Sequence, residues 1–188
     1  NWYAGKQYDD FVTGVHDVLD HFAENFPQYK DRGYEIAGFA WWQGHKDGNA
    51  AHAGRYEFNL VNLINAVRAE FDAPKAPFVM ATIGFNGWGM AGPHLTVANA
   101  QLAVSGETGK YPEFAGNVLT VETRDFWIDH ALSPHNQGFH YNGNAETYLK
   151  VGGALGRGMV KLLSQEKTKT KNVDMAKLQA DFLKLKLK

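Results

Sequence analysis

Short apolar runs alternate along this chain with longer segments in which apolar residues recur every three or four positions. The short runs predict strands buried on both faces, and they lie at residues 35–41, 78–84 and 117–122. The periodic segments predict amphipathic helices, and they lie at residues 6–26, 56–71, 96–104 and 144–163. This alternation predicts an α/β domain, with a mainly parallel sheet between two layers of helices.

The C-terminal part of the chain has a different composition. Residues 165–171 are predicted to form a linker, and residues 172–188 a Lys- and Leu-rich helix or tail. Seven lysines follow position 166, whereas the rest of the chain carries a negative net charge. Val173, Leu178 and Phe182 would share one side of such a helix, which either docks against the acidic body or ends as a solvated terminus. We therefore expect one domain at residues 1–164 and an appendage at 165–188.

Composition excludes several classes of function. The net charge of −1 supplies no field that would attract nucleic acid, and no apolar run is long enough to span a membrane. The absence of cysteine excludes disulfides, thiolate metal sites and a cysteine nucleophile. The histidines lack metal-binding spacing, so we expect no metal and no other cofactor. The chain begins without Met or a signal peptide, which fits a processed or truncated start.

Polar side chains appear abruptly where the first predicted strand ends, at residues 41–47 (WWQGHKD). Ligands of parallel sheets bind beyond the carboxyl ends of the strands. Gln43 could donate its amide to a developing oxyanion, or it could satisfy backbone groups at the strand end. Asp47 could assist a catalytic base, and Trp42 could line a sugar-stacking cleft, although each type of residue also serves in ordinary packing and capping. His45 belongs to the same cluster.

A second polar cluster, residues 137–144 (QGFHYNGN), precedes the last helix of the main body. His140 is well placed as a general base, because the ordinary histidine pKa near 6.5 suits proton transfer at neutral pH. The alternative is a histidine that only forms hydrogen bonds within its loop. The two clusters together indicate a hydrolase site whose nucleophile is not visible in the chain.

Both clusters resemble blocks of one known family. Residues 38–47 (GFAWWQGHKD) resemble the Trp-Gln-Gly block of the sialate O-acetylesterase-like SGNH hydrolases, which include acetylxylan esterases of the sixth carbohydrate-esterase family. Residues 137–148 are similar to the family's last block, which carries the catalytic histidine, and the resemblance covers residues 1–164. It implies a flavodoxin-like α/β/α fold and hydrolysis of acetyl esters on sugars, in a secreted or periplasmic protein. It also implies that His140 deprotonates a serine and that Gln43 serves the oxyanion hole.

The chain departs from the family pattern at the nucleophile, at the second oxyanion block and at the acidic helper. It has no Gly-Gln-Ser-Asn-like block, and its serines are Ser105, Ser133 and Ser164. Gln137 and His45 stand where the family carries an acidic residue. Two hypotheses follow. In the first, the chain is the C-terminal portion of a carbohydrate O-acetylesterase, and a missing N-terminal segment of the same protein carries the serine. In the second, it is a carbohydrate-binding relative without catalysis.

Overall fold

The computed structural model describes residues 5–186, with side chains described as far as residue 165. Its strands are β1 (Phe39–Trp41), β2 (Phe78–Ala81) and β3 (Val118–Val121). Its helices are α1 (Lys6–Asp20), the single turn α2 (Phe22–Asn25), α3 (Tyr56–Glu70), α4 (Gly92–Val104) and α5 (Ala145–Lys186). Short 3-10 turns connect these elements, and several of them carry residues of the candidate site.

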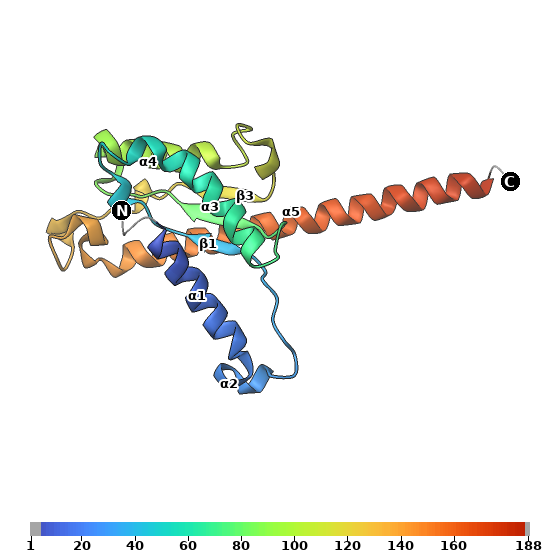
Figure 1. Cartoon of the computed structure of the whole chain (residues 1–188). Coiled ribbons are helices and arrows are strands. Elements are labelled where there is room, and N and C mark those ends of the chain that lie inside the picture. The colour runs from blue at the N-terminus through green and yellow to red at the C-terminus, as the bar shows by residue number, and fades with distance from the viewer. Residues whose placement is uncertain (1–4, 187–188) are drawn as a thin grey trace.

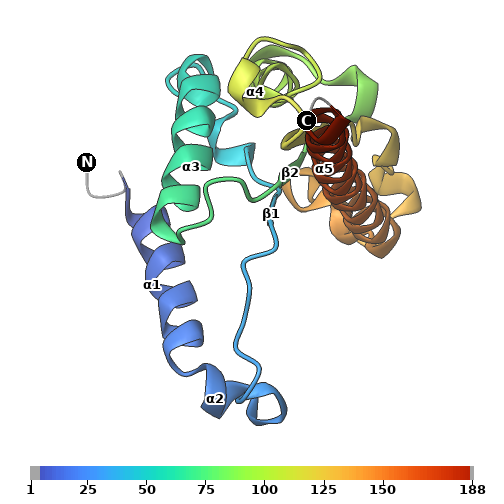
Figure 2. The ribbon, with the colours of Figure 1, turned by 90° about the vertical axis from the view of Figure 1, so that its right-hand side faces the viewer.

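The three strands form one parallel sheet in the order β1-β2-β3, as the sequence predicts. Helices α3 and α4 cover one face of the sheet and α5 covers the other, so the chain folds in three layers (Figures 1 and 2). Side chains along β2 alternate between these layers: Phe78 and Met80 join the core under α3 and α4, whereas Val79 lies against Gly158 of α5. Because both faces are covered, β2 is buried along its whole length, which explains its continuous apolar sequence.

The β1 side of the sheet is much less buried than the β2–β3 side. Only residues 39–41 form a strand here, although the sequence pattern predicts one from about residue 35. Helix α1 has no buried residue, and Phe11 meets only the edge of Phe71 at the end of α3. A cavity of about 320 Å³ lies between Phe11 and the strand residues Phe39 and Trp41. The preceding residues stay irregular because a strand is held by its neighbours, and β1 pairs with β2 alone.

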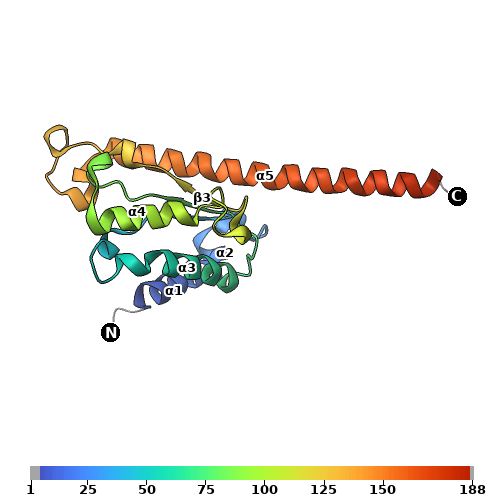
Figure 3. The same ribbon diagram turned by 90° about the horizontal axis from the view of Figure 1, so that it is seen from above.

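Helix α5 continues well past the sheet (Figure 3). It runs without interruption through residues 165–171, where the sequence pattern predicted a linker. The physical reason is that no glycine or proline follows Gly158 to break the helix. The predicted docking of Val173, Leu178 and Phe182 concerns side chains outside the described residues. No helix in the described part of the chain combines the length and apolarity that a membrane crossing requires.

Candidate active site

The two polar clusters of the sequence lie side by side at the carboxyl end of the sheet. The Trp42 indole packs on the Tyr141 ring with centroids 4.7 Å apart. The rings of His45 and Phe139 lie 5.5 Å apart. Phe85, which follows β2, contacts both His45 and Tyr141 and so joins the clusters. Segments nearly a hundred residues apart in sequence therefore form one aromatic cluster beyond the strand ends.

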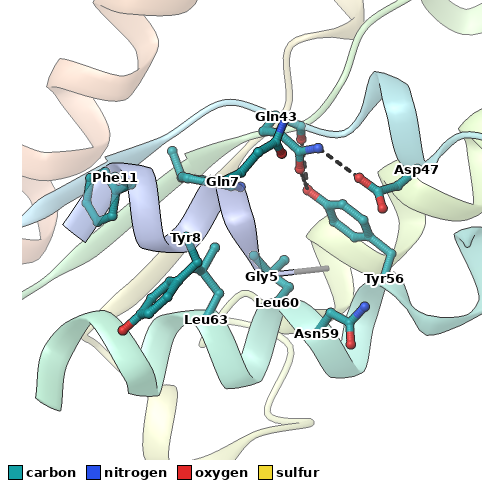
Figure 4. A pocket seen from close by; sticks show the side chains of 11 residues that line it. Gly5, Gln7, Tyr8, Phe11, Gln43, Asp47, Tyr56, Asn59, Leu60 and Leu63 are labelled. Carbon is teal, nitrogen blue, oxygen red and sulfur yellow. Dashed lines mark hydrogen bonds between the residues drawn. The ribbon is translucent and has the colours of Figure 1, made fainter. Parts of the chain in front are cut away.

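The Gln43 side chain lies beside Tyr56 and Asp47 and lines a cavity of about 260 Å³ between β1, α1 and α3 (Figure 4). Its side-chain nitrogen donates to the Asp47 carboxylate at 2.8 Å, and its side-chain oxygen accepts from the Tyr56 hydroxyl at 3.1 Å. The amide group is therefore held in one orientation. Asp47 orients Gln43, and no described hydrogen bond joins Asp47 to a histidine.

A buried glutamine on α4 fixes the backbone beneath Gln43. The side-chain nitrogen of Gln101 donates to the Gln43 carbonyl at 2.7 Å and to the Tyr56 hydroxyl at 3.1 Å. Its side-chain oxygen accepts from the N–H of Ile83, just beyond β2, at 2.8 Å. Burial raises the pKa of Tyr56 to about 12, so its hydroxyl remains a donor to Gln43 at any physiological pH. Sequence patterns do not identify Gln101 or Tyr56, because both look like ordinary helix residues.

Replacing Gln101 with leucine should lower the free energy of unfolding by about 2 kcal/mol, because the Ile83 N–H loses its acceptor and the Gln43 carbonyl loses a donor. Urea denaturation measures this change. Asn62→Leu, on the exposed side of α3, is the matched control and should stay within about 0.5 kcal/mol of the unaltered chain. Equal stability of the two variants would show that Gln101 does not hold this strand end.

His140 lies on a loop whose backbone is held in an uncommon conformation. Tyr141 and Asn142 both have positive φ, at 51° and 56°. The buried Asn142 side chain secures the loop by accepting from the Gln137 N–H at 3.1 Å and donating to the Ile128 carbonyl at 3.0 Å. The Tyr141 hydroxyl accepts from the Gly84 N–H at 3.2 Å. Strained backbone of this kind persists only where surrounding contacts enforce it, and it is concentrated at functional sites.

The His140 ring is exposed, and it packs against the Phe139 ring at 4.4 Å. The Gln137 carbonyl accepts the His140 backbone N–H at 2.9 Å, so Gln137 shapes the loop through its main chain. Burial lowers the pKa of the neighbouring His45, and the nearby His94, Lys46 and His140 lower it further. Within residues 5–165 no carboxylate is hydrogen-bonded to His140.

The structure does not bring Gln43 and His140 into contact. His140 is not among the residues that line the cavity of Gln43, so their convergence on one reacting carbonyl stays a prediction. Within the described residues, no hydrogen bond joins His140 to one of the chain's serines either. The Ser105 oxygen accepts from the Thr120 N–H, Ser133 donates to the Asp129 carbonyl, and Ser164 on α5 donates to the Val160 carbonyl. No group of histidine and acidic residues suited to a metal ion occurs in the described part of the chain.

A parallel sheet between two layers of helices defines the three-layer α/β/α class, in which ligands bind beyond the carboxyl ends of the strands, where Gln43 and the His140 loop lie. The chain belongs to the carbohydrate esterase family described as sialic acid-specific acetylesterase, whose model matches residues 2–161. No curated protein matches the chain significantly.

Among solved structures, a protein from Arabidopsis thaliana is similar to this chain, with 21% sequence identity and a TM-score of 0.55. The similarity covers 82% of this chain but 52% of that protein. The chain therefore spans about half the length of this structural relative, and the likeness at this identity concerns the fold.

Proposed function

We propose that this chain is the histidine-bearing portion of a serine carbohydrate O-acetylesterase, and that a strand outside the chain carries the nucleophile and adds beside β1. One observation carries the proposal: the candidate site is held rigidly by hydrogen bonds, whereas the neighbouring edge of the sheet has no further strand in the described part of the chain. Gln43 and the His140 loop are held by buried hydrogen bonds at the carboxyl end. The neighbouring β1 edge faces an apolar cavity and a helix without buried residues.

In this mechanism the serine hydroxyl attacks the carbonyl carbon of a sugar acetyl ester, and His140 takes the hydroxyl proton. The protonated His140 then gives that proton to the departing sugar oxygen, which leaves an acetyl-serine. Water, deprotonated by His140, releases acetate and restores the serine. Within the described residues Asp47 is the one acceptor of the Gln43 side-chain nitrogen, so its second N–H is open to stabilise the oxyanion.

The test compares the 188-residue chain with a longer form that includes its natural preceding segment. The short chain should release no acetate from 4-nitrophenyl acetate or acetylated xylan, whereas the longer form should hydrolyse both. Turnover by the short chain that disappears when Ser105, Ser133 or Ser164 is replaced would contradict the proposal.

A second function, carbohydrate binding without catalysis, is favoured by one observation. His140 has no described carboxylate partner to orient its ring, and Gln137 contributes only backbone contacts to its loop. A longer form that binds acetylated oligosaccharides but hydrolyses neither of the two esters would support this second function.

A further inference from the structure

Trp88 is a large aromatic residue that is exposed and yet held in place. It lies in the turn η4 (Gly87–Gly89) beyond β2, and 63% of its surface is open to solvent. Its indole N–H donates to the Asp125 carboxylate at 2.6 Å. The Arg124 guanidinium carbon lies 4.2 Å from the ring centroid and so covers one face of the indole. The rest of the ring remains exposed.

The groups that hold Trp88 are themselves anchored to the strand ends. The Arg124 side chain makes two hydrogen bonds to Glu122, from Nε to Oε1 at 2.9 Å and from Nη2 to Oε2 at 2.6 Å. Glu122 also accepts from the Thr82 hydroxyl at 3.0 Å. Burial raises the pKa of Glu122, but the Arg124 side chain and backbone and the Thr82 hydroxyl lower it by more, so the carboxylate stays charged.

The backbone beneath Trp88 also presents the indole in one position. Gly87 is buried with a φ of +53°, and a Cβ there would come within 3.3 Å of Trp127. The same Trp127 lies 3.7 Å from a Cβ built on Gly138, in the loop of His140. The turn of Trp88 and the loop of the candidate base therefore share one packing neighbour.

Stability alone does not account for this arrangement. Apolar surface stabilises a fold only when it leaves water, and most of the indole remains in water. The Arg124 side chain covers only one face of the indole, so this contact leaves most of Trp88 in water. A fixed, exposed aromatic face loses little conformational entropy when a ligand covers it, which favours binding.

We propose that the open face of Trp88, in the turn beyond β2, is a sugar-stacking subsite, which takes a pyranose ring of an acetylated oligosaccharide next to the esterified residue. This inference rests on the proposed carbohydrate function. The apolar C–H face of a pyranose fits the indole plane, and Asp125 at the ring edge offers an acceptor to a sugar hydroxyl. The substrate class is therefore an acetylated chain of pyranose units rather than a single acetylated sugar.

The test measures binding of an acetylated xylotetraose to the 188-residue chain by calorimetry, which needs no nucleophile. Trp88→Ala should weaken binding about tenfold or more, and Trp88→Phe should restore most of the affinity because it retains a stacking face. Tyr34→Ala is the matched control, because Tyr34 is an aromatic residue that is 57% exposed in the segment before the amino end of β1.

Unchanged affinity of Trp88→Ala together with a lower melting temperature would overturn the inference, since Trp88 would then serve only to join two turns. Failure of the unaltered chain to bind the tetrasaccharide would overturn it as well. Neither result contradicts the proposed esterase chemistry, which is tested separately by hydrolysis of 4-nitrophenyl acetate in the longer form.

Discussion

Replacing His140 with asparagine should lower kcat/KM for acetyl-ester hydrolysis by about 10⁴-fold in the longer form that we propose carries the serine. Asparagine is polar and similar in reach, but it cannot exchange a proton near neutral pH. The His140 ring is exposed, and the loop is held by Asn142 and Tyr141 rather than by the imidazole. The variant should therefore fold normally, with an unchanged melting temperature.

The control for this experiment is His130→Asn, which removes an exposed histidine that contacts only the adjacent Asp129. Its activity should equal that of the unaltered protein. Full activity of the His140 variant would contradict the assignment of the base. If activity were then lost on replacing His45, the other imidazole beside Phe139 would be the base instead.

Replacing Arg68 with methionine should lower the free energy of unfolding by about 3 kcal/mol. Arg68 is buried, and its guanidinium makes two hydrogen bonds to the Ala76 carbonyl, at 3.0 and 2.7 Å. It makes two more to Asn117, at 3.1 Å to the backbone carbonyl and 2.7 Å to the side-chain oxygen. Methionine preserves the volume but leaves these acceptors unsatisfied.

These bonds matter because Ala76 lies two residues before β2 and Asn117 immediately precedes β3, so Arg68 aligns the amino ends of both strands with α3. Burial lowers the pKa of Arg68, which shows that its charge is costly there. A methionine variant as stable as the original chain would mean that this cost cancels all four bonds. Arg157→Met, on the exposed side of α5, is the control and should change stability by less than about 0.5 kcal/mol.

The sequence by itself determined the architecture of the central layer. The apolar runs identify β2 and β3 because both strands are covered on two faces, so nearly every position is buried. The same logic places residues 41–47 and 137–144 at one end of the sheet, since parallel strands direct their carboxyl ends to the same side. Family resemblance in these two blocks agrees with the family match over residues 2–161.

The tertiary structure alone decided how the site is held. Gln101 supports Gln43 from 58 positions away, and the Tyr141 hydroxyl reaches Gly84 across 57 positions. Neither pairing leaves a periodic signal in the sequence, because a side chain that satisfies a distant backbone group obeys no fixed spacing. The sequence pattern does not identify the role of Trp88 for the same reason, since its partners Arg124 and Asp125 follow a different strand.

The edges of the fold were the least predictable from the sequence. The apolar pattern at residues 35–38 remains irregular backbone because a strand exists only where a neighbour supplies hydrogen bonds. The amphipathic α1 has an apolar face, but none of its residues is fully buried. Local sequence thus determined which segments could become helix or strand. Contacts between distant segments decided which of them did, because burial and hydrogen bonding depend on the neighbours that each segment finds.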